Sequence, residues 1–171
     1  PTDGMTCGSW NSLEFGENFL DAENVSVAYD NTNGVTYVAF TDVQSNIRVF
    51  EGRGGDWNQV FDVLEYDTSN AGGSSAAPTI VVQPQTNDVW LAYLNNNSEI
   101  MVLRRFNGNE GFEEVGSPVG YSNAGFGWLE DSGEQMLAFT VVASGEAYVV
   151  TTGDNSLLYH LDPSMDVWQD W

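Results

Sequence analysis

The side chains best suited to catalysis or metal binding are few and far apart in this chain. Among 171 residues there is one histidine, His160, and one cysteine, Cys7. A zinc or copper site needs several such ligands close together. The sequence also has no Gly-x-Ser-x-Gly motif and no phosphate-binding glycine loop between a strand and a helix. We therefore expect no catalytic residue and a protein that is not an enzyme.

Paired carboxylates are the remaining route to an enzyme, because glycoside hydrolysis uses two of them at a set separation. The chain has 25 Asp and Glu residues, so many pairs are possible and none stands out. The four arginines do not suggest a cluster that would grip an acidic sugar. Arg104 and Arg105 are adjacent, and neighbouring residues of a strand point to opposite faces. A glycosidase-like enzyme is thus our third alternative.

The charge balance excludes some partners. The formal net charge is −21, with four arginines and no lysine. Such a chain is repelled by nucleic-acid phosphates and by anionic membrane surfaces. No stretch approaches the roughly 20 consecutive apolar residues of a membrane helix. We expect no nucleic-acid binding and no membrane insertion.

Calcium is the one cofactor that the sequence makes possible. Asp30, Thr32 and Asn33 place oxygen-bearing side chains in a short segment before Gly34. Cation-binding loops use this kind of spacing. The segment lacks the terminal glutamate of an EF-hand, however, and the interpretation as a hairpin turn is the stronger one.

Carbohydrate is a second candidate ligand. Exposed aromatic rings can stack on sugar faces, and four aromatic residues could serve here: Trp90, Tyr121, Trp128 and Trp171. Two Asn-x-Ser sequons, at Asn24 and Asn96, would accept glycans in a secreted protein. These features favour an extracellular or cell-surface location.

The elements that must position these residues come from an internal repeat. The segment Val35–Phe40 matches Asp88–Tyr93 at an offset of 53 residues, and Tyr148–Val150 matches Tyr37–Ala39 at an offset of 111. An aromatic marker closes each unit, at Trp10, Trp57, Phe112 and Trp168. Repetition at this period indicates stacked units of one kind.

Within each unit the apolar residues alternate with a period of two, which predicts strands and no helix. The expected strands are 25–30, 35–42, 46–51 and 57–63 in the first unit, 78–83, 89–94, 99–105 and 112–116 in the second, and 135–142, 147–152, 156–161 and 167–171 in the third. Four antiparallel strands per unit of about fifty residues are typical of a β-propeller blade. The fold class is therefore all-β.

Several of these segments resemble a family of secreted β-propeller proteins with repeats of about 50 residues. The resemblance rests on Tyr37–Asp42, Pro78–Val82 and Val115–Ala124. It implies the propeller fold and an extracellular setting, and no particular activity.

We expect residues 1–21 to be the end of a preceding blade with its connector, and residues 22–74, 75–127 and 128–171 to be three blades. Propellers close with about four to eight blades, so three do not form a ring. We expect further blades of a longer protein to complete the ring; the alternatives are association of copies into a ring or filament, and stacking of the units in an open array. The expected function is a non-catalytic module of adhesion or extracellular assembly, whose partners are copies of itself or other extracellular proteins. Carbohydrate binding is the alternative.

Overall fold

The computed structural model describes residues 23–42, 46–54, 56–62, 78–94, 100–116, 137–151, 157–162 and 167–170. In this part of the chain there are twelve strands and no helix. They are β1 (Glu23–Asp30), β2 (Val35–Thr41), β3 (Ile47–Arg53), β4 (Asp56–Asp62), β5 (Thr79–Val82), β6 (Val89–Leu94), β7 (Ile100–Arg105), β8 (Glu113–Glu114), β9 (Leu137–Val141), β10 (Ala147–Thr151), β11 (Leu157–Asp162) and β12 (Val167–Asp170). Consequently, no helix in these residues is long and apolar enough to cross a membrane.

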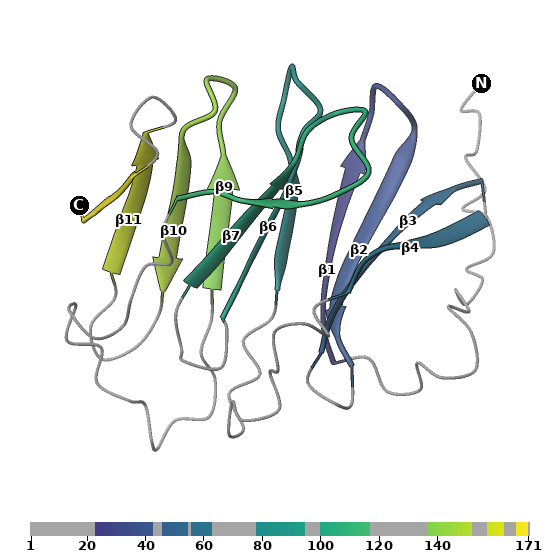
Figure 1. The fold of residues 1–171 in the computed structure, drawn as a ribbon, viewed down its shortest axis with the longest axis horizontal. Helices are drawn as coiled ribbons and strands as arrows, with labels where there is room; N and C mark the ends of the chain where they lie inside the picture. The colour runs from purple at the N-terminus through teal and green to yellow at the C-terminus, as the bar shows by residue number, and fades with distance from the viewer. Residues whose placement is uncertain are drawn as a thin grey trace, which may run out of the picture.

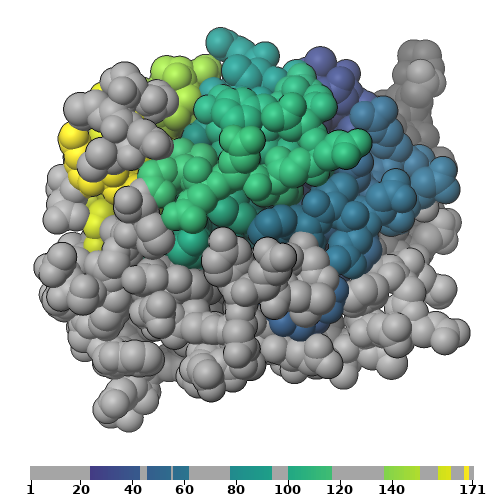
Figure 2. Space-filling model, viewed as in Figure 1, coloured from purple at the N-terminus to yellow at the C-terminus, as the bar shows by residue number. Residues whose placement is uncertain are grey.

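The strands form three antiparallel sheets of four, each built from consecutive strands. The first sheet is β1 to β4, the second is β5 to β8, and the third is β9 to β12. The sheets lie side by side as an open row, with the second in the middle (Figures 1 and 2). The predicted all-β fold of three four-stranded antiparallel units is confirmed, and the arrangement is propeller-like. The boundaries proposed for the blades stay predictions.

The short turns follow from local chemistry. Asp30 ends β1, and its Oδ1 accepts hydrogen bonds from the backbone N–H groups of Thr32 (2.8 Å) and Asn33 (3.0 Å). Gly34 then adopts a positive φ of 66°, which glycine tolerates best. The chain therefore reverses tightly into β2.

Two apolar clusters lie between the sheets, because both faces of a middle sheet must be covered, and a third, of Val38, Phe40 and Phe50 with Trp57, lies on the other face of the first sheet. One apolar cluster joins the first and second sheets and includes Tyr37, Ala39, Ile80 and Leu91. Ala39, a small residue in this crowded strand, is fully buried. Stacking of sheets also explains why β2 is buried along almost its whole length.

A second cluster joins the second and third sheets. It includes Trp90, Ala92, Phe139 and Val149, with Trp168 packed against it. The Trp168 indole N–H also donates to the carbonyl of Val115 at 3.4 Å. This unit marker thus packs between two sheets.

The inner strands β1, β5 and β9 lie next to one another and are linked directly. The backbone N–H of Ile80 donates to Ser26 Oγ (3.1 Å), and Thr79 Oγ1 donates to the carbonyl of Leu137 (3.1 Å). Hydrogen bonds therefore cross both boundaries near the inner edge of the row, and Gln83 Nε2 adds another at the second boundary by donating to the carbonyl of Ala143 (3.4 Å).

Candidate functional site: a hollow between the first and second sheets

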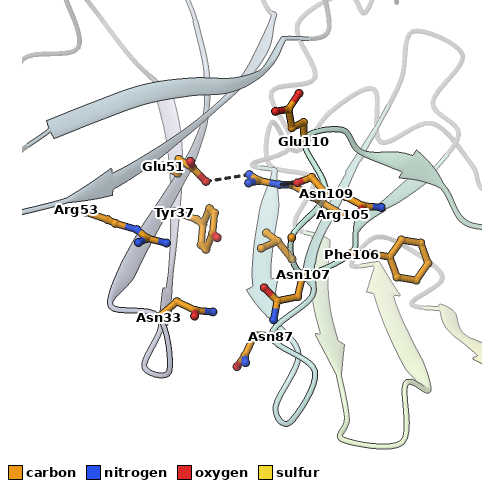
Figure 3. Close-up of a pocket in the computed structure, with 12 residues that line it drawn as sticks. Asn33, Tyr37, Glu51, Arg53, Asn87, Arg105, Phe106, Asn107, Asn109 and Glu110 are labelled. Carbon is orange, nitrogen blue, oxygen red and sulfur yellow. Dashed lines mark hydrogen bonds and ion pairs between the residues drawn. The ribbon is translucent and has the colours of Figure 1, made fainter.

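A polar concavity lies where the first and second sheets meet. It has a volume of about 230 Å³ and opens beside the β1–β2 and β7–β8 turns. Its lining combines an aromatic ring with charged and amide groups, among them Tyr37, Glu51, Arg105, Asn107 and Asn109. We call it the first hollow. Figure 3 shows Tyr37, Glu51 and Arg53 on one side and Arg105 and Asn107 on the other.

An ion pair spans the boundary at this point. Arg105 Nη1 of β7 lies 3.0 Å from Glu51 Oε2 of β3, and both side chains are mostly buried. Arg105 Nε donates to the carbonyl of Asn109 at 2.8 Å. The guanidinium carbon also lies 6.0 Å from the centre of the Tyr37 ring. Three contacts therefore fix the direction in which Arg105 presents its remaining N–H groups.

Tyr37 forms the floor of the first hollow. Burial raises the pKa of its hydroxyl, because desolvation disfavours the phenolate. The neighbouring positive charge of Arg105 opposes this effect, whereas Glu51 and Asp30 add to it. Tyr37 therefore carries a neutral hydroxyl, and as a residue that is 6% exposed it adds little accessible surface to the first hollow.

The β7–β8 turn, which contributes Asn107 and Asn109 to the first hollow, is held in place by Asp88, the residue before β6. Asp88 Oδ1 accepts a hydrogen bond from the backbone N–H of Asn107 at 2.7 Å, and Gly108 follows with a φ of 88°. Asp88 Oδ2 accepts from Arg104 Nε at 3.1 Å. Asn107 and Asn109 are thus presented by a turn that is held in place.

The pKa of Asp88 is lowered overall. Burial by itself would raise this pKa, but hydrogen bonds from Arg104 and Asn107 and the positive charge of Arg104 outweigh the burial. Asp88 is therefore a charged anchor whose loss of charge would loosen the turn.

A repeat-related hollow of about 210 Å³ lies between the second and third sheets, and we call it the second hollow. The pairing of strands shows the relation, because Tyr37 faces Glu51 in the first sheet as Trp90 faces Arg104 in the second. By the same pairing, Leu161 of the third sheet stands where Arg105 stands in the second. The second hollow therefore lacks an ion pair like that between Arg105 and Glu51.

The sugar-stacking prediction for Trp90 is wrong. Trp90 has an exposed fraction of 0%, and its indole N–H donates to Gln83 Oε1 at 3.1 Å. Its ring packs near Phe139 at 6.4 Å between ring centres. The residue is covered because the third sheet packs directly over it. Tyr121, Trp128 and Trp171 lie outside the described residues.

The calcium candidates lie in the β1–β2 turn. Asp30 is buried, and besides the two backbone bonds its Oδ2 accepts from Asn33 Nδ2 at 2.7 Å. Thr32 and Asn33 are exposed. These hydrogen bonds support the interpretation as a turn, in which the carboxylate caps the backbone. Calcium binding stays a prediction.

The predicted glycosylation sites and the cysteine lie away from the first hollow or outside the described residues. Asn24 lies in β1 with a φ of 55°, next to an irregularity in the β1–β2 pairing, and its glycosylation stays a prediction. Asn96 and Cys7 lie outside the described residues. Within the described ranges, no group of three or more His, Cys, Asp or Glu side chains is placed to hold a metal ion.

Sequence reasoning missed the residues of the first hollow. Glu51 and Arg105 are 54 positions apart, and neither belongs to a motif. The only sequence signal was that Arg104 and Arg105 should point to opposite faces, and this is confirmed: Arg105 contacts the first sheet, and Arg104 lies over Trp90.

Comparisons with known proteins bear on the fold alone. No family model matches this sequence, and no curated protein sequence matches it. A solved structure that is similar is a variant of AofleA from Arthrobotrys oligospora with three arginines replaced by alanine. It has a TM-score of 0.62 and 16% identity, covering 92% of this chain and 43% of the AofleA chain. This chain thus spans less than half the length of that neighbour. The replaced arginines lie 53 residues apart, the interval that separates the first two units here.

Proposed function

We propose that this chain is a non-catalytic, carbohydrate-binding β-propeller module of an extracellular or cell-surface adhesive protein. The observation that carries the proposal is the first hollow, with its ion pair between Arg105 and Glu51 beside Tyr37. In this proposal the protein adheres to its partners by binding their sugars in the first hollow.

The chemistry of the first hollow suits a sugar ring. Sugar hydroxyl groups both donate and accept hydrogen bonds, and the lining offers guanidinium and amide N–H donors together with carboxylate and amide acceptors. Tyr37 also lines the hollow, but it is 6% exposed, so polar groups and not ring stacking would hold the sugar. The volume is below the range of about 300–1,000 Å³ for drug-sized ligands. A single sugar residue is therefore the expected occupant.

The negative charge of the molecule disfavours the binding of acidic sugars. Two glutamates, Glu51 and Glu110, and two arginines, Arg53 and Arg105, line the first hollow, so its own formal charges balance, whereas the whole chain carries a formal charge of −21. Sialic acids, uronic acids and sulfated sugars would be repelled. We infer that the ligand is a neutral sugar.

Propeller architecture also supports a site at this position. The first hollow is built by two adjacent sheets and by the turns at one end of them, so it is held by the packed core. AofleA has arginines at a 53-residue interval, whereas in this chain Gly52 and Leu161 stand at the positions equivalent to Arg105 in the first and third sheets. In this chain, Arg105 is the arginine that reaches across a boundary between sheets.

A glycan array tests the proposal, using the purified chain and both neutral and acidic glycans. We expect binding to neutral glycans alone. The best neutral sugar is then titrated by calorimetry against Arg105→Ala, and affinity should fall about tenfold or more, since a hydrogen bond to a charged group contributes about 1.5–3 kcal/mol.

The matched control is Arg48→Ala. Arg48 also lies in a strand and forms a partly buried ion pair, 2.8 Å from Asp42, but it does not line the first hollow. Its removal should leave sugar affinity unchanged. Equal losses in both variants, or an array with no neutral glycan bound, would contradict the proposal.

A further inference from the structure

The sequence contains two Asn-Gly pairs, Asn33-Gly34 and Asn107-Gly108, and both asparagines line the first hollow. Figure 3 shows Asn33 on the side of the first sheet and Asn107 on the side of the second. An asparagine that precedes glycine is prone to spontaneous deamidation, because glycine has no Cβ to keep the side-chain amide away from the next backbone nitrogen. The sequence alone would therefore treat the two pairs as equally reactive.

Deamidation consumes water and needs no enzyme, metal or oxidant. The glycine nitrogen gives up its proton and forms a bond to Cγ of the asparagine. The bond from Cγ to Nδ2 then breaks, and the side-chain nitrogen takes up the proton and leaves as ammonia. Water opens the remaining cyclic imide to aspartate or isoaspartate. The reaction is fastest where the glycine N–H donates no hydrogen bond and the asparagine amide is free to turn.

The β1–β2 turn holds both reacting groups in hydrogen bonds. The N–H of Gly34 donates to the carbonyl of Asp30 at 2.8 Å, and Asn33 Nδ2 donates to Asp30 Oδ2 at 2.7 Å. Asp30 is buried, so these bonds fix the turn to the core. Asn33 and Gly34 are exposed to water, but both hydrogen bonds must break before the imide can form.

The β7–β8 turn leaves the same two groups free. The N–H of Asn107 donates to Asp88 Oδ1 at 2.7 Å, and the N–H of Asn109 donates to the carbonyl of Phe106 at 2.9 Å. Within the described part of the chain, neither the N–H of Gly108, which lies between them, nor the side-chain amide of Asn107 forms a hydrogen bond. Both residues are exposed, and a Cβ at Gly108 would meet no atom within 4 Å. The nucleophile and the amide are thus neighbours in an open turn.

We propose that Asn107 is a site of spontaneous deamidation in the folded protein, and that the hydrogen bonds of the β1–β2 turn protect Asn33. Exposure alone does not mark the site. Asn109 is exposed in the same turn, but the side chain of Glu110 crowds the nitrogen that would attack. Asn107 combines exposure, a following glycine and a free N–H.

Deamidation of Asn107 changes the first hollow. A neutral amide with N–H donors becomes a carboxylate, which only accepts hydrogen bonds. The formal charges of the lining, which balance in the unmodified protein, gain a negative charge. Isoaspartate also lengthens the backbone before Gly108. We expect weaker sugar binding after the reaction. This consequence rests on the proposed function, whereas the modification itself does not.

Peptide mass spectrometry of the folded chain, aged at mildly alkaline pH in heavy-oxygen water, tests the proposal. Opening of the imide adds a heavy oxygen atom at the residue that reacted. Asn107 should react about tenfold faster or more than Asn33, since two hydrogen bonds hold the latter pair. In urea, the unfolded chain should modify both residues at similar rates, because each is followed by glycine.

Three variants separate the cause from the consequence. Asn107→Gln should remove the acidic form that ageing produces on anion exchange, because a longer side chain closes the imide ring far more slowly. Asp30→Ala releases the Asn33 amide and should raise the rate at Asn33. Asn107→Asp reproduces one product and should weaken binding of the best neutral sugar about fivefold or more.

Two labelling results would overturn the proposal. One is a folded chain in which Asn107 stays unlabelled while the unfolded chain reacts. The other is equal labelling of Asn33 and Asn107 in the folded chain. Unchanged sugar affinity of the deamidated fraction would refute the effect on the first hollow. A chain that binds no sugar would instead refute the proposed function, and the labelling pattern would still decide the modification.

Discussion

Arg104 and Arg105 are consecutive in β7, yet each faces a different neighbouring sheet. Arg105 reaches the first sheet and lies 3.0 Å from Glu51, whereas the guanidinium carbon of Arg104 lies 5.0 Å from the Trp90 ring centre on the side of the third sheet. One strand thus supplies a cation to both boundaries of the second sheet. Arg105 pairs with a carboxylate of the neighbouring first sheet, whereas Arg104 pairs with Asp88 of its own sheet, so the two repeat-related hollows differ in chemistry.

Asp88 should make stability depend on pH in the acid range. The pKa of Asp88 is lowered in the folded state. The charged carboxylate therefore contributes to folding stability at pH values above the unfolded pKa, about 3.9, and this contribution is lost as the pH falls through the folded pKa. In urea unfolding, the wild type should exceed Asp88→Asn in stability at neutral pH, and the difference should shrink below about pH 4. Asp56→Asn, at an exposed position, serves as the control. A difference that stays constant down to the lowest pH would refute this role.

Trp90 should matter for stability and not for sugar contact. Removing a fully buried tryptophan leaves a large cavity, and Trp90→Ala should cost about 3–5 kcal/mol in the free energy of unfolding. Trp90→Phe should cost less and should keep the chain folded, with sugar affinity at the first hollow unchanged. Loss of sugar binding in a well-folded Trp90→Phe variant would contradict this account.

Asp30 should act as a turn cap. Asp30→Ala removes three hydrogen bonds and should lower the free energy of unfolding by about 1–3 kcal/mol, with a smaller loss for Asp30→Asn. Thermal melting of the wild type should be the same with calcium and with a chelator. If calcium raised the Tm of the wild type but not of Asp30→Ala, the turn would be a cation-binding loop.

Gly52 should not tolerate a side chain. A Cβ at this position would lie 2.6 Å from ring carbons of Trp57, which pairs with Gly52 across β3 and β4. Gly52→Ala should therefore cost about 1–3 kcal/mol through overpacking. Gly111→Ala is the control, because a Cβ there would meet no atom within 4 Å. Equal stability of the two variants would show that Trp57 moves aside without cost.

The fold was predictable because its signals are local. Alternating apolar residues and turn residues such as Asn33 and Gly34 are read within a few positions, and the predicted strand 35–42 compares with Val35–Thr41 observed. The 53-residue offset also placed equivalent strands correctly.

The site was not predictable, because it depends on how sheets pack. Glu51 and Arg105 meet only after two sheets stack, and no motif marks either residue. Trp90 failed as a sugar candidate for the same reason, since its burial comes from the third sheet and not from its own neighbours in sequence.

Binding of a neutral sugar in the first hollow is the central claim, and an NMR titration tests it most directly. Backbone amide signals of the labelled chain are followed while the best neutral sugar from the array is added. We predict saturable shifts at Asn107, Asn109 and Arg105, with signals of the second hollow, such as Glu113 and Leu161, unchanged. Shifts confined to the second hollow, or no saturable shift at any residue, would contradict the claim.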